Sequence, residues 1–96
     1  MNHIHKNPLF DLGQTVATPG AIEVLQALNI SPTSLLCRHQ CGDWGDLCDE
    51  DQAENKYALS HGYRLFSSYK ITETIKIWVI TEADRSVTTL LLPEDY

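Results

Sequence analysis

The sequence has few basic residues and no long apolar run. Seven Lys and Arg stand against thirteen Asp and Glu, so the 96-residue chain has a formal net charge of -6. This charge disfavours direct, nonspecific binding to nucleic acid and favours a basic partner. No apolar run approaches the roughly 20 residues of a membrane-spanning helix, and residues 1–6 lack the apolar core of a signal peptide. We therefore expect a cytoplasmic protein without a membrane partner.

Cysteine is also scarce. Cys37, Cys41 and Cys48 are an odd number of thiols in a short stretch, which is a poor framework for a disulfide-stabilised domain. Together with His39 they offer four ligands of the kind that zinc prefers, but the paired short knuckles of structural zinc sites are missing. Nothing nearby is typical of a base that would activate a cysteine nucleophile. We predict reduced, buried thiols, no metal and no cofactor.

The composition is that of an ordinary globular domain, with 43% apolar and 21% charged residues. Residues 1–17 show neither helical nor strand periodicity, and we expect them to form a loosely ordered N-terminal arm. Residues 18–96 should form one domain, because a chain of this length holds one hydrophobic core.

Three helices are indicated before residue 63. Thr18 followed by Pro19 is a helix start signal, and the apolar residues after it repeat at helical spacing to about residue 29. Ser31 and Pro32 repeat the signal for a short second helix that should end at about residue 42. A third helix is expected over 49–61, with Asp49 as its N-cap in a capping box.

The periodicity changes to two after residue 62. Alternating side chains in 63–71, 75–80 and 87–92 predict three strands, and the short connections between them favour antiparallel pairing. The predicted fold class is α+β, with two to three N-terminal helices packed on one face of a C-terminal three-stranded antiparallel meander.

Carboxylates are concentrated in one segment that contains no Lys or Arg. Six of the chain's thirteen acidic residues lie there: Asp43, Asp46, Asp49, Glu50, Asp51 and Glu54. A calcium loop that starts at Asp43 is excluded, because Cys48 stands where such loops need glycine. Two interpretations remain: a solvated helix start that benefits from the helix dipole, or an array that imitates nucleic-acid charge and docks on a basic groove.

Trp44 lies between two glycines beside these acids. An aromatic residue in such a loop is typical of an interface anchor, although packing against the core is an equally concrete alternative. The turn at residues 81–86 is a second candidate for partner binding, through Glu82, Asp84 and Arg85. Its two carboxylates could instead divide acid and base roles in a small nuclease or hydrolase, or simply satisfy the backbone of a hairpin.

The chain also resembles a family of small bacterial proteins carried on plasmids and other mobile elements, labelled plasmid-related proteins or restriction-modification subunits. The resemblance covers about residues 15–96, while Cys37 and Cys41 lie outside the pattern. The matching stretches are Thr18-Pro19-Gly20-Ala21, His39, Gly42-Asp43-Trp44-Gly45-Asp46-Leu47, Ala58-Leu59, Gly62, Arg64-Leu65, Lys76-Ile77-Trp78, Ile80-Thr81-Glu82-Ala83-Asp84-Arg85-Ser86, Thr88-Thr89 and Leu91-Leu92-Pro93-Glu94.

The resemblance implies a context in which small acidic proteins inhibit host defence, as anti-restriction and anti-CRISPR proteins do. The expected function is therefore a non-enzymatic inhibitor that occupies a basic surface of a defence nuclease or RNA-guided effector complex. The alternatives are a small enzyme that uses Glu82, Asp84 and Arg85, a toxin-like ribonuclease fold, which the acidic balance opposes, and an oligomer that serves plasmid regulation.

Overall fold

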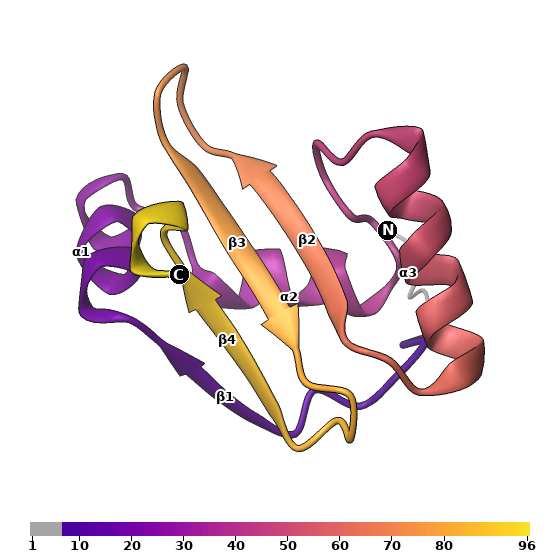
Figure 1. Cartoon of the computed structure of the whole chain (residues 1–96). Helices are drawn as coiled ribbons and strands as arrows, with labels where there is room; N and C mark the ends of the chain where they lie inside the picture. Colours follow the sequence, from indigo (N-terminus) through magenta and orange to yellow (C-terminus); the bar gives the residue numbers. More distant parts are fainter. Residues whose placement is uncertain (1–6) are drawn as a thin grey trace, which may run out of the picture.

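The chain folds into a four-stranded mixed sheet with three α-helices, in a computed structural model that describes residues 7–96 (Figure 1). The strand order across the sheet is β1-β4-β3-β2. The elements in chain order are β1 (Gln14–Ala17), α1 (Pro19–Ala27), α2 (Pro32–Gln40), α3 (Asp49–His61), β2 (Leu65–Lys70), β3 (Lys76–Thr81), β4 (Val87–Leu91) and the 3₁₀ turn η1 (Pro93–Asp95).

The α+β class is confirmed, and the predicted meander corresponds to β2, β3 and β4, which pair antiparallel in that order. The sheet has one strand more than predicted. β1 pairs parallel with β4, with Gln14 opposite Val87 and Ala17 opposite Leu90. Parallel pairing requires a long crossover between the two strands, which here contains the three helices, β2 and β3.

The predicted arm of residues 1–17 needs correction at its C-terminal end. Residues 14–17 belong to the sheet, and backbone hydrogen bonds from Gln14 N to Ser86 O (2.9 Å) and from Thr18 N to Leu90 O (3.0 Å) hold the strand at both ends. A strand of four residues is too short for alternating side chains to reveal it in the sequence. Its place in the sheet depends instead on hydrogen bonds to the free edge of β4. Residues 1–6 of the predicted arm lie outside the described residues.

The helix starts follow the sequence signals, with one correction. Thr18 caps α1, because its Oγ1 accepts a hydrogen bond from Ala21 N at 3.2 Å. Asp49 is not the N-cap of α3: Cys48 occupies that position without a side-chain cap bond, and Asp49 is the first residue of the helix. Gly62 ends α3 in the left-handed conformation, with φ of 72°.

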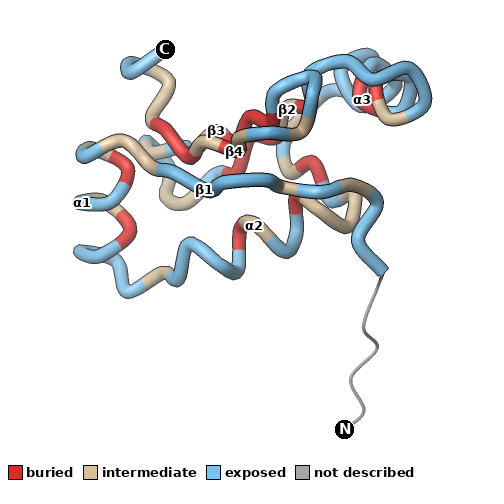
Figure 2. Tube along the Cα trace, turned by 90° about the horizontal axis from the view of Figure 1, so that it is seen from below, coloured by how far each residue is buried: buried red, intermediate tan, exposed pale blue. Residues whose placement is uncertain are grey.

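The predicted packing of two to three helices on one face of the sheet holds for α1 and α2 but does not extend to α3. Figure 2 shows α1 and α2 below the sheet, while α3 lies at its side, next to β2. The main core fills the space between the sheet and the first two helices. Its buried residues are Ala21, Leu25, Leu35, Tyr69, Ile77, Val79 and Leu90.

The outer edge of β2 is covered, which protects the sheet from pairing with another strand. The side-chain amide of Asn55 on α3 donates to Phe66 O (2.6 Å) and accepts from Phe66 N (3.1 Å). Further along the edge, Ser68 N donates to Trp44 O (3.1 Å) and Asp46 N donates to Ser68 O (2.7 Å). The acidic loop and α3 are thus fixed to the sheet through its edge.

Candidate functional site

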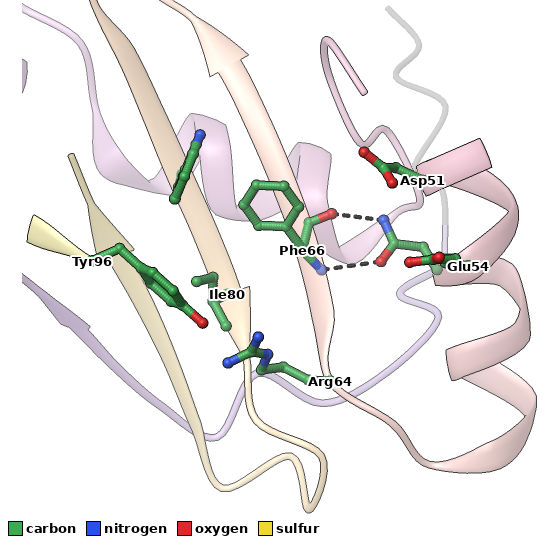
Figure 3. Close-up of a pocket in the computed structure, with 8 residues that line it drawn as sticks. Asp51, Glu54, Arg64, Phe66, Ile80 and Tyr96 are labelled. Carbon is green, nitrogen blue, oxygen red and sulfur yellow. Dashed lines mark hydrogen bonds between the residues drawn. The ribbon is translucent and has the colours of Figure 1, made fainter. Parts of the chain in front are cut away.

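A hollow lies on the face of the sheet that α1 and α2 leave uncovered. Side chains alternate between the two faces of a strand, so Ile77 and Val79 enter the core while Trp78 and Ile80 point the other way. The hollow has a volume of about 360 Å³ (Figure 3). It is lined by Asp51, Glu54, Asn55, Arg64, Phe66, Trp78, Ile80 and Tyr96.

Three aromatic rings form one wall of this hollow. The ring centroids of Phe66 and Trp78 are 5.1 Å apart at an interplanar angle of 86°, and those of Trp78 and Tyr96 are 5.9 Å apart at 69°. Both are the edge-to-face arrangements that aromatic quadrupoles favour. The guanidinium carbon of Arg64 lies 5.8 Å from the Tyr96 ring centroid, at the distance of a cation–π contact.

The opposite wall is acidic. Asp51 and Glu54 are exposed on α3, three positions apart and therefore on the same side of the helix. Figure 3 shows both carboxylates on the α3 side of the hollow, with Arg64 and Tyr96 facing each other across from them. Within residues 7–96 the ion pairs are Arg38–Asp43 and Lys70–Glu73, and neither uses Asp51 or Glu54. The lining therefore carries two carboxylates and one guanidinium.

The other acidic residues singled out from the sequence have two different environments. Asp46 is exposed in the loop before α3, and Asp49 and Glu50 are exposed in the first turn of this helix. Asp43 instead holds its own loop: its carboxylate accepts from Arg38 Nε (2.7 Å) and Gly45 N (3.2 Å). The Asp43 carboxylate is thus exposed but already engaged in contacts with the protein's own residues.

Trp44 belongs to the core and is only 8% exposed. It packs with Ala58 and Leu65 in a second cluster beneath α3, and its ring stacks against Phe10 with centroids 6.3 Å apart. Of the two roles that the sequence left open for Trp44, the structure supports core packing. The tryptophan on the uncovered face is Trp78, which sequence reasoning placed in a strand and in a matching stretch but did not propose as a site residue.

The turn after β3 is organised around Arg85, whose guanidinium contacts backbone carbonyls. Its Nη1 donates to Tyr63 O (2.7 Å) and its Nη2 to Ala58 O (3.3 Å), and these bonds join the turn to the end of α3. Asp84 accepts from the hydroxyl (2.6 Å) and amide (3.0 Å) of Ser86, which hold the pKa of Asp84 below its usual value. A lowered pKa opposes a role as general acid. Glu82 is exposed on the same turn.

A buried chain of polar groups runs beneath the sheet, and sequence reasoning did not find it. His39 Nδ1 lies 2.5 Å from Ser67 Oγ, and His39 Nε2 lies 2.9 Å from Thr81 Oγ1. Thr81 Oγ1 is 2.7 Å from Thr88 Oγ1, and Thr88 donates to Leu12 O at 2.7 Å. His39 and Ser67 are both 0% exposed, so the pair does not reach solvent as a nucleophile and base would need to.

Cys37 and Cys48 are exposed, so the expectation of buried thiols was wrong for both. In the described part of the chain, no three or more His, Cys, Asp or Glu side chains gather as a metal site would require. None of the helices described is long and apolar enough to cross a membrane.

Among the hollows of the described residues, this one joins three aromatic rings to three charged side chains. A second hollow of about 410 Å³ shares Glu54 and Arg64 with it and is lined further by Ala53, Tyr57, Ala58 and Tyr63. The hollow with three rings is built from α3, Arg64 before β2, β2, β3 and the residue after η1. Comparisons of the chain with protein-family models, with curated proteins and with solved structures found no match.

Proposed function

We propose that this protein is a non-enzymatic binding protein that docks on a basic surface of a partner protein, through the start of α3 and the adjoining uncovered face of the sheet. The observation that carries the proposal is a group of five exposed carboxylates at the start of α3, two of which, Asp51 and Glu54, line an aromatic hollow. These carboxylates are Asp46, Asp49, Glu50, Asp51 and Glu54. Protein interfaces combine such aromatic anchors with complementary charge at the rim.

Helix α3 supports the acidic surface in two ways, through its dipole and through the contacts that fix it to the sheet. Asp49 and Glu50 lie in the first turn of α3, where acidic residues interact favourably with the positive end of the helix dipole. The edge contacts of Asn55 and Trp44 hold α3 and its loop against β2. A charge array on a fixed scaffold requires little ordering when it binds, which favours affinity.

The partner we propose is a defence nuclease or an RNA-guided effector complex, whose nucleic-acid channel is lined by Lys and Arg. Occupation of that channel by an acidic domain blocks nucleic-acid entry. This part of the proposal is supported by the resemblance to mobile-element proteins and by the net charge of -6. The negative charge also opposes direct nucleic-acid binding by this chain.

Protection assays with restriction and CRISPR systems in cells provide the test. The double variant Asp49→Lys/Glu50→Lys should lose protection, because it reverses charge at the centre of the acidic surface. The matched control is Glu23→Lys/Glu73→Lys, which makes the same change in net charge at exposed positions on α1 and on the β2–β3 loop. Equal protection by both variants would contradict the charge-based docking, as would the absence of protection by the unaltered protein in every system.

A further inference from the structure

We propose that the hollow between α3 and the sheet receives the guanidinium group of an arginine side chain that the partner protein presents. This inference rests on the proposed function, because it names the group on the basic surface that enters the uncovered face. The occupant is argued from three features of the lining: aromatic rings, unpaired carboxylates and the geometry of Arg64.

The rings supply the first feature. Phe66, Trp78 and Tyr96 come from three separate segments, and their edge-to-face contacts place them on one wall. The faces of aromatic rings attract cations, and tryptophan does so most strongly. Three rings around one hollow thus favour a cationic group with an apolar stem over a neutral polar group.

The carboxylates supply the second feature. Asp51 and Glu54 line the same hollow from α3, and they take part in neither ion pair found within residues 7–96. With Arg64 as the counter-charge, the lining has one negative charge in excess. A second cation completes the charge balance, whereas a phosphate or carboxylate ligand would increase the imbalance.

Arg64 supplies the third feature, since the chain already seats one guanidinium in this hollow. The guanidinium carbon of Arg64 is 5.8 Å from the centroid of Tyr96, the ring at the edge of the wall. The plane of a guanidinium stacks on an aromatic face while its N–H groups reach carboxylates in pairs, which the round, strongly hydrated ammonium of lysine does less well. The remaining rings and carboxylates therefore fit arginine better than lysine.

The two tryptophans of the chain allow a direct test, because only one lines the hollow. Indole N–H resonances are followed by NMR in the ¹⁵N-labelled protein while the peptide acetyl-Gly-Arg-Gly-amide is added. The Trp78 resonance should move and saturate, while that of Trp44, which is buried, should stay in place. The same peptide with citrulline, a neutral isostere, should leave both resonances unchanged, and the lysine peptide should bind more weakly than the arginine peptide.

Carboxylate variants test whether the acidic wall of the hollow contributes to binding of the arginine peptide. Glu54→Gln should weaken binding of the arginine peptide roughly three- to tenfold, since it removes a charge-assisted contact. The matched control Glu23→Gln, at an exposed position on α1 outside both the hollow and the acidic surface, should change binding less than twofold. Equal shifts with the citrulline peptide, a larger Trp78 shift with adenosine monophosphate, or no shift of Trp78 at about 10 mM arginine peptide would each overturn the inference.

Failure here is distinguishable from failure of the proposed function. If the peptide does not bind but Asp49→Lys/Glu50→Lys still abolishes protection in cells, docking on a basic surface stands and the arginine hollow is rejected. If the peptide binds as expected but the double variant protects fully, the hollow stands and the charge-based inhibition is rejected.

Discussion

His39 Nδ1 and Ser67 Oγ lie 2.5 Å apart in the interior, where neither residue has any solvent exposure. The chain of hydrogen bonds that contains them has only one consistent direction. A backbone carbonyl only accepts, so the hydroxyl of Thr88 donates its single proton to Leu12 O. Thr81 must then donate to Thr88, and His39 Nε2 must donate to Thr81. Because burial lowers the pKa of His39 to about 4, the ring is neutral at pH 7, and its Nδ1 accepts from the hydroxyl of Ser67.

The first prediction is that His39 is a neutral Nε2–H tautomer at neutral pH. Side-chain ¹⁵N shifts of the labelled protein should show an unprotonated Nδ1 and a protonated Nε2 for this residue. Ser67→Ala removes the donor to Nδ1 and leaves a buried acceptor unsatisfied, which should lower the free energy of unfolding by about 1–3 kcal/mol. A protonated Nδ1 in the unaltered protein would contradict the assigned direction of the whole chain.

The second prediction concerns pH. Burial, with a smaller contribution from the positive charge of Arg85, lowers the pKa of His39 to about 4. The unfolded chain binds this proton with a pKa of about 6.5, so it takes up more protons than the folded protein between these two values. The contribution of His39 to stability is therefore complete above about pH 6.5 and is lost as the pH falls towards 4, by up to about 3 kcal/mol.

Urea unfolding at several pH values between 4 and 7.5 measures this dependence. The matched variant is His39→Gln, whose amide offers a donor and an acceptor but does not titrate. Its free energy of unfolding should be lower at neutral pH and should fall less between pH 6.5 and 4. A fall as steep as that of the unaltered protein would show that other groups cause the pH dependence.

The third prediction compares two glycines with similar backbone angles. Gly45 has φ of 78° and Gly62 has φ of 72°. The left-handed conformation costs an L-residue at either position roughly 1–2 kcal/mol. A Cβ at Gly45 would also collide with the carbonyl oxygen of Ser68, whereas a Cβ at Gly62 would meet nothing within 4 Å. Gly45→Ala should therefore lower the melting temperature much more than Gly62→Ala, and equal shifts would contradict the close approach to β2.

The fourth prediction tests how α3 is held at its C-terminal end. Arg85→Ala removes the guanidinium that bonds to Ala58 O and Tyr63 O, and should lower the free energy of unfolding by about 2 kcal/mol. Because Arg85 has φ of 62°, Arg85→Gly should be less harmful than alanine. Hydrogen exchange should show faster opening of the last turn of α3 in both variants, and unchanged exchange there would contradict the tether.

The sequence by itself determined the local structure and its class. Proline after Thr18 and Ser31 marked two helix starts, glycine marked the end of α3, and alternation located β2, β3 and β4 within two residues. These signals depend on neighbouring residues, through capping bonds and the period of each element, and so they are readable along the chain.

The tertiary structure alone decided where these elements meet. β1 exists because the edge of β4 offers it backbone partners, and α3 lies beside the sheet because Asn55 bonds to Phe66 and Arg85 bonds to the end of the helix. The hollow around Trp78 likewise joins residues from 51 to 96. Contacts between residues so far apart depend on how the faces and edges of finished elements fit together, and no local pattern of side chains records that fit.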